Sequence, residues 1–221
     1  MIDLVNKKIN GNLFIKQGSE NMEKLKHVKP SKEYEQEALE YINEFYEYNS
    51  DINGSGGLHK YLDNYDKWLE KLEEDRTRIP NEEKVPAETY FLVRESDNKI
   101  VGMINIRLAL NENLKKFGGH IGYSIRPTER KKGYNKVNLY LGLLCCKEHG
   151  ISEVLVDCDK NNPASAKTMQ ALGGKLIREY YDDTYAHCTV QDYVINVDEA
   201  IEKYSDIYEP LIIKDTVRLK K

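Results

Sequence analysis

The sequence predicts an α/β fold, because segments with the two-residue period of a strand alternate with segments that have the 3.6-residue period of a helix. Residues 120–126 alternate apolar and polar side chains, and the proline that follows ends the strand. The next helix has apolar residues at i, i+3, i+4, i+7 and i+8, counted from Val137. A second apolar strand is predicted at residues 153–158, before a helix that ends near Leu172. These four elements form the centre of the predicted domain.

The elements before this centre follow a polar segment at residues 1–22, which is predicted to be an N-terminal extension. They are a strand at 25–28, a helix from the N-cap Ser31 to about residue 49, a glycine loop at 53–57, a helix over 58–72, and a hairpin of strands at 89–95 and 99–110.

The elements after the centre are a second hairpin and a short helix. The hairpin strands are predicted at 175–181 and 188–197, and Asp198 is predicted to cap the helix. The chain therefore divides into an extension at 1–22, a main domain at 23–197, and a C-terminal helix and tail at 198–221.

Composition excludes several classes of protein. The net charge of −4 gives no basic excess, so no nucleic-acid partner is expected. No apolar run approaches the ~20 residues of a membrane span, and the first residues lack the apolar core of a secretion signal. The four cysteines form no CxxC pair, so we expect free thiols in a reducing cytoplasm and no metal site.

A basic loop lies between the first central strand and its helix. The loop contains Arg130, Lys131, Lys132 and Gly133. The first N–H groups of a helix lack partners inside it and carry partial positive charge, and a glycine lets a ligand approach the backbone. The segment is therefore a candidate site for a phosphate or pyrophosphate. The alternative is a solvated basic turn before an ordinary core helix.

Two sequence blocks resemble the GNAT superfamily of N-acyltransferases. RKKGYN, preceded by IGYSIRP, is similar to its acetyl-CoA loop: Arg130 and Gly133 match the pattern, and Asn135 departs from it at the last position. The second block is the strand at 153–158, then Asn-Asn-Pro-Ala-Ser, then a helix that ends in Gly-Gly, where Gly174 replaces the usual aromatic residue.

The resemblance implies a mixed, mostly antiparallel sheet of six to seven strands flanked by helices. A splayed parallel pair, 120–126 and 153–158, would form the cleft for acetyl-CoA. The resemblance implies that the diphosphate is held by Arg130, Lys131, Lys132, Gly133, Tyr134 and Asn135. It implies that the pantetheine arm is held by backbone groups of Ser124 and Ile125 on one side and by Asn162 and Ser165 on the other.

The resemblance also implies direct attack of an amine on the thioester in a ternary complex. His120 is the first candidate for the base, since a histidine is partly neutral at pH 7; the alternative is a structural histidine that ties the Gly118-Gly119 turn to the sheet. Glu129 is a weaker candidate. Met169 stands where many relatives carry the tyrosine acid, so Tyr181 or a neighbouring tyrosine of the last hairpin is expected to take that role.

The acceptor is predicted to be a primary amine. The helices at 31–49 and 58–72 are strongly acidic, which would attract a small cationic amine, or they are only a solvated surface. A protein N-terminus or lysine is the alternative acceptor. The rival functions are a non-catalytic module that binds acyl-CoA and a site for another phosphate ligand such as a nucleotide. The terminal arms and the last hairpin are candidate surfaces for a homodimer.

Overall fold

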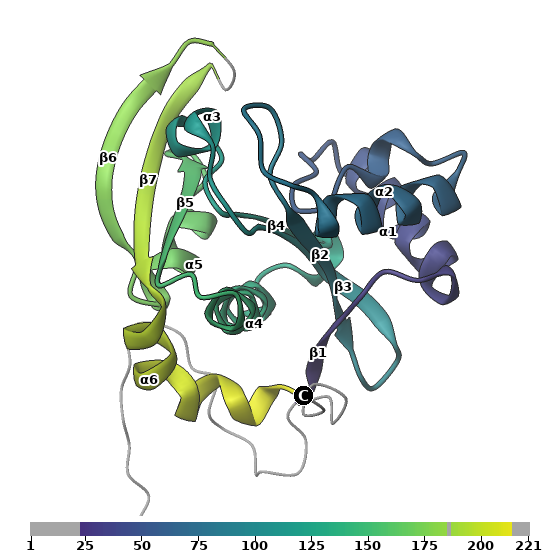
Figure 1. Ribbon diagram of the computed structural model, residues 1–221. Coiled ribbons are helices and arrows are strands. Elements are labelled where there is room, and N and C mark those ends of the chain that lie inside the picture. The colour runs from purple at the N-terminus through teal and green to yellow at the C-terminus, as the bar shows by residue number, and fades with distance from the viewer. Residues whose placement is uncertain (1–22, 185–186, 214–221) are drawn as a thin grey trace, which may run out of the picture.

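The computed structural model describes residues 23–184 and 187–213 (Figure 1). The predicted extension at 1–22 and the end of the tail lie outside the described residues. No helix in the described ranges is long and apolar enough to cross a bilayer.

In residues 23–184 and 187–213, seven strands form two sheets. The four-stranded sheet is antiparallel throughout and contains, in spatial order, β1 (Leu25–Val28), β2 (Ala87–Arg94), β3 (Lys99–Arg107) and β4 (Ile121–Ile125). The three-stranded sheet, also antiparallel, has the order β5 (Glu153–Asp159), β7 (Cys188–Asn196) and β6 (Lys175–Asp182). The predicted fold class is confirmed, but the predicted single mixed sheet of six to seven strands is instead two antiparallel sheets of four and three strands, divided between β4 and β5.

Two helices cover one face of the four-stranded sheet. They are α1 (Glu35–Glu47) and α2 (Tyr65–Thr77), shown to the right of the sheet in Figure 1. Their apolar stripes bury Tyr41, Phe45 and Trp68 against Phe91 of β2. The second helix begins later than predicted, because Leu58–Lys60 forms a separate 3-10 turn and the side chain of Asn64 caps the α-helix.

The helix α4 (Tyr134–Glu148) lies on the other face of this sheet and joins the two sheets through the larger core cluster. The short helix α3 (Glu112–Lys116) precedes β4, and α5 (Pro163–Ala171) follows β5. The C-terminal helix α6 (Val197–Tyr208) packs on α4, where the rings of Tyr140 and Tyr208 lie 5.2 Å apart. Its cap is Asn196 rather than the predicted Asp198.

Candidate functional site

β4 is an edge strand of the four-stranded sheet, and β5 is an edge strand of the three-stranded sheet. A gap separates these two strands. The strands are joined at one end, where the N–H of His120 donates to the carbonyl of Leu155 at 2.7 Å. Beyond this point β4 pairs only with β3 and β5 only with β7 among the described residues. The facing edges of β4 and β5 beyond this point therefore have no strand partner in the described part of the chain, which is the backbone arrangement that a peptide-like arm pairing with β4 requires.

The side chain of His120 holds the closed end of this gap. Its Nδ1 atom accepts a hydrogen bond from the N–H of Leu155 at 3.0 Å. Burial, assisted by the charge of Arg107, lowers the pKa of His120, so the ring is neutral at pH 7. A neutral ring whose Nδ1 accepts a hydrogen bond carries its own hydrogen on Nε2. The geometry therefore favours the structural role over the role of base.

The loop before α4 presents unpaired backbone donors. Gly133 is the N-cap of α4, with φ of 83°, and Lys131 has φ of 64°, a left-handed conformation that is strained for lysine. In the described structure, no hydrogen-bond acceptor is found for the N–H groups of residues 131–135. Left-handed residues that alternate with right-handed ones turn successive N–H groups to one side, and such concavities bind anions.

Two basic side chains of this loop, Arg130 and Lys132, already form hydrogen bonds or ion pairs with other residues of the protein. The carboxylate of Glu129, which is 5% exposed, accepts hydrogen bonds from Arg94 at 2.8 Å and from Lys132 at 2.7 Å. Burial alone would raise the pKa of Glu129, but these two cations lower it overall. Arg130 donates to Ser50 Oγ at 2.7 Å. The predicted phosphate contacts of Arg130 and Lys132 thus compete with existing bonds.

Asn135, the residue that departs from the family pattern, supplies an orphaned acceptor. Its Oδ1 atom is buried and has no hydrogen-bond partner within the described part of the chain. A buried acceptor without a partner carries the full cost of desolvation. The amide groups of a pantetheine arm would satisfy it, so the residues present fit the expected ligand.

The far side of the gap is formed by the first turn of α5. Asn162 Oδ1 accepts from the N–H of Ser165 at 3.2 Å and so caps the helix. The hydroxyl groups of Ser165 and Tyr123 lie 2.8 Å apart, so a side chain of β4 spans the gap to α5. Met169 is fully buried and serves the core.

Tyr181 is not brought to this gap. It lies on β6, which β7 separates from β5, it is 66% exposed, and its hydroxyl donates to the carbonyl of His187 at 3.4 Å. The tyrosine that does reach the gap is Tyr123, whose pKa burial raises, so that its hydroxyl keeps its proton. In the sequence, Tyr123 is one of the apolar residues that alternate along the strand at 120–126, and nothing there indicates its contact with Ser165.

The glycine loop packs directly on the other face of β4. A Cβ atom on Gly54 would lie 2.5 Å from the carbonyl oxygen of Gly122, and the Ser124 hydroxyl donates to the carbonyl of Asn53 and lies 3.0 Å from the Tyr41 hydroxyl. The loop is therefore a fixed part of the structure rather than a loose connector.

A cavity of about 260 Å³ lies beside this loop. His59, Lys71, Asp75 and Arg107 line it together with loop residues. Burial, with the nearby charge of Lys60, lowers the pKa of His59, which keeps this ring neutral at pH 7. In the sequence, the one feature that marks His59 is its position just after the glycine loop, and His59 was not among the predicted site residues.

Much of the acidic charge of α1 and α2 is already paired. Glu37 and Glu44 of α1 form ion pairs with the buried Arg126, and Asp75 of α2 pairs with Lys71 and Arg78. These pairs reduce the attraction that the two helices would exert on a cationic molecule.

Three comparisons with known proteins bear on this geometry. The model of the acetyltransferase (GNAT) domain matches residues 31–175. A search of curated proteins gave no significant match.

Solved structures share the fold at low sequence identity. Mutant forms of the spermidine/spermine N-acetyltransferase SpeG from Vibrio cholerae match with a TM-score of 0.56 and 10% identity, over 81% of this chain and 98% of that one. The ribosomal-protein-S5-alanine acetyltransferase from Vibrio fischeri matches with a TM-score of 0.54 and 15% identity, over 79% and 93%. The microcin C7 self-immunity acetyltransferase MccE, solved with acetyl-CoA and AMP, matches with a TM-score of 0.57 and 13% identity, over 78% and 92%.

The matched domain covers well over half of the chain and contains both the donor loop before α4 and the gap between β4 and β5. The chain belongs to the GNAT family of acetyltransferases.

Proposed function

We propose that this protein transfers the acetyl group of acetyl-CoA to a primary amine by direct attack in a ternary complex. The observation that carries the proposal is the run of unpaired N–H groups at residues 131–135, at the start of α4 and beside the gap between β4 and β5. These donors suit a diphosphate, and the gap suits the arm that joins the diphosphate to the thioester.

Acetyl-CoA would supply an activated acyl group, and residues of the chain would hold it and manage protons. Backbone groups of Ser124 and Ile125 on β4 and the Oδ1 of Asn135 are proposed to hold the arm, with the first turn of α5 on the other side. The hydroxyl of Tyr123 is proposed to give a proton to the leaving thiolate, a role for which the sequence had suggested Tyr181.

The base is proposed to be His59 rather than His120. An amine with an ordinary lysine-like pKa of ~10.4 is almost wholly protonated at pH 7, so attack requires a group that removes a proton. His59 is neutral and lines the cavity beside β4, whereas the Nδ1 of His120 is already bonded to the backbone.

Two classes of amine are candidates for the acceptor. A small cationic amine was predicted from the acidic helices, and the SpeG structures are of a spermidine/spermine N-acetyltransferase. Asp75, which lines the cavity, is paired with Lys71 and Arg78. Lys71 and Arg107 supply N–H donors to the cavity lining, although Lys71 pairs with Asp75 and Arg107 donates to the carbonyl of Gly118. These groups would donate hydrogen bonds to carbonyl oxygens, so we favour the α-amino group of a peptide, the class of the predicted alternative.

Release of free CoA from acetyl-CoA, followed with a thiol reagent, tests the proposal. We expect release that depends on a peptide with a free N-terminus, and none with the same peptide acetylated at that end. Faster release with spermidine would restore the cationic acceptor. Binding of acetyl-CoA without release in the presence of any amine would instead support the rival function of a non-catalytic module.

A further inference from the structure

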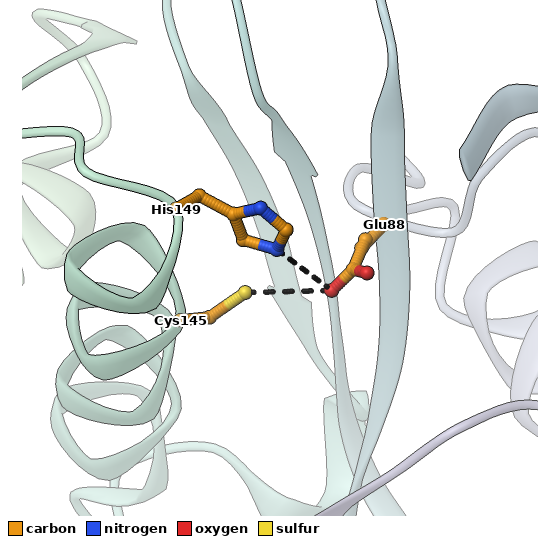
Figure 2. A group of neighbouring side chains, drawn as sticks. All are labelled: Glu88, Cys145 and His149. Atoms are coloured by element: carbon orange, nitrogen blue, oxygen red, sulfur yellow. Dashed lines mark hydrogen bonds and ion pairs between the residues drawn. The ribbon is translucent and has the colours of Figure 1, made fainter. Parts of the chain in front are cut away.

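Three potential metal ligands meet at the end of α4 opposite to its donor loop. Cys145 and His149 stand one helical turn apart, at i and i+4, and face Glu88 of β2 (Figure 2). One ligand atom from each residue lies within 4.8 Å of the other two. Cys145 is buried, Glu88 is partly buried and His149 is exposed, so the group opens to solvent on one side. This cluster shares no residue with the proposed acetyl-transfer site.

The distances from Glu88 to the other two ligand atoms agree with the edges of a tetrahedron around zinc. With zinc–ligand bonds of about 2.0–2.3 Å, two ligand atoms of a tetrahedral site lie about 3.3–3.6 Å apart. The Sγ of Cys145 lies 3.5 Å from Glu88 Oε2, and Nε2 of His149 lies 3.6 Å from the same oxygen. Little movement of the side chains would be needed to enclose an ion.

The carboxylate of Glu88 is held in place by an outer hydrogen bond, because the Tyr90 hydroxyl donates to Glu88 Oε2. Tyr90 is itself fixed by the ring of His27, which stacks on it at 5.3 Å. A ligand oriented by an outer hydrogen bond is typical of protein metal sites.

We propose that Glu88, Cys145 and His149 bind a Zn²⁺ ion, with a water molecule from the open side as the fourth ligand. A thiolate, an imidazole and a carboxylate form a donor set that suits zinc better than magnesium or calcium, which prefer oxygen ligands. Binding replaces the thiol proton of Cys145, which passes to solvent, by the metal. The ion links β2 to the last turn of α4. The absence of CxxC pairs predicted no metal site, whereas the sequence signal for this cluster is the Cys-x-x-x-His spacing of Cys145 and His149.

Metal binding by the full-length protein tests this inference. The protein is freed of metal by dialysis against a chelator, and Zn²⁺ is then titrated in competition with a chromophoric chelator. We expect one ion per chain, a higher thermal midpoint in the presence of Zn²⁺, and a thiolate-to-metal absorption band when Co²⁺ replaces Zn²⁺. Absence of saturable binding by the wild type would overturn the proposal.

Substitutions decide whether these three residues are the ligands. Cys145→Ser and His149→Gln should each weaken binding by more than the about 10–100-fold typical of losing an outer-shell partner, and Cys145→Ser should remove the cobalt band. Cys146→Ser is the control, since Cys146 is a buried thiol next in sequence but outside the cluster. Equal affinity in all four proteins would refute the site. If Cys145→Ser does not fold, the exposed His149→Gln decides alone.

Discussion

The Nδ1 atom of His120 accepts a hydrogen bond from the N–H of Leu155 at 3.0 Å, and this bond fastens β4 to β5 at the point where the gap between them begins. The side chain thus acts as a hydrogen-bond acceptor for the backbone. An asparagine can offer an acceptor oxygen in a similar position, but it cannot act as a base.

We therefore predict that His120→Asn keeps most of the activity and that His120→Ala loses stability. Removing the acceptor leaves the N–H of Leu155 unpaired, at a cost of about 1–3 kcal/mol in the free energy of unfolding. Urea unfolding measures the stability, and CoA release measures the rate. A base at this position would instead make the asparagine variant as inactive as the alanine variant.

The burial of His120 affects how the stability of the protein depends on pH. Burial lowers the pKa of His120 in the folded protein below its unfolded value of about 6.5. The stabilisation is therefore complete above about pH 6.5 and is lost as the pH falls below that value, because the unfolded chain then takes up a proton that the folded one resists. Burial also lowers the pKa of His59, so this residue likewise reduces the stability of the folded protein as the pH falls. The His120→Asn variant should show a shallower loss than the wild type.

His59→Gln should lower kcat by about a hundredfold or more if His59 removes the proton from the amine. The base works in its neutral form, so activity is lost as the pH falls through its pKa, and burial places that limb below the ordinary 6.5. The pH profile of kcat measures the position of this acid limb. His187→Gln is the control, because His187 is an exposed histidine on the last hairpin. Unchanged kcat and an unchanged acid limb in His59→Gln would exclude the role.

Tyr123→Phe should lower kcat while the KM for acetyl-CoA changes little. The substitution removes the hydroxyl that lies 2.8 Å from Ser165 Oγ but keeps the ring. General acids contribute about a hundredfold or more, and a thiolate leaves comparatively well, so we expect the lower end of that range. Tyr181→Phe, on the outer strand, should retain wild-type kinetics. The reverse order of the two variants would return the acid role to Tyr181.

Gly54→Ala should impair use of the amine more than use of acetyl-CoA. The added Cβ would lie 2.5 Å from the carbonyl oxygen of Gly122 and 2.6 Å from Tyr123 Cα, so the glycine loop must move away from β4. Gly57→Ala is a matched control: it also has a positive φ, yet nothing lies within 4 Å of its Cβ. Each carries a strain of about 1 kcal/mol from the left-handed backbone. Steady-state kinetics with both substrates should therefore show a raised amine KM only for Gly54→Ala.

The sequence was sufficient for elements whose structure is decided locally. The period of β4, the glycine before α4 and the apolar periods of the helices are read from neighbouring residues, and the fold class followed from them. The beginning of α2 was missed because the Asn64 cap competes with an apolar pattern that starts earlier, at Leu58.

Long-range pairing was the part that the sequence could not reveal. The bond between His120 and Leu155, the contact of Tyr123 with Ser165 and the pairing of Glu37 with Arg126 join residues that are 35, 42 and 89 positions apart. Each depends on how strands and helices are placed in space, so a residue's type could suggest a role without identifying its partner.

The most direct test of acetyl-CoA use is a thermal shift with acetyl-CoA, CoA and ATP side by side, on the wild type and on Gly133→Glu. A ligand that binds only the native state at a hundredfold excess over Kd adds about 2.7 kcal/mol, which raises the midpoint by several degrees. We predict a shift with both CoA forms for the wild type and none for the variant, where a carboxylate would oppose the diphosphate. A shift with ATP alone, or no shift with either CoA form, would contradict the proposed function.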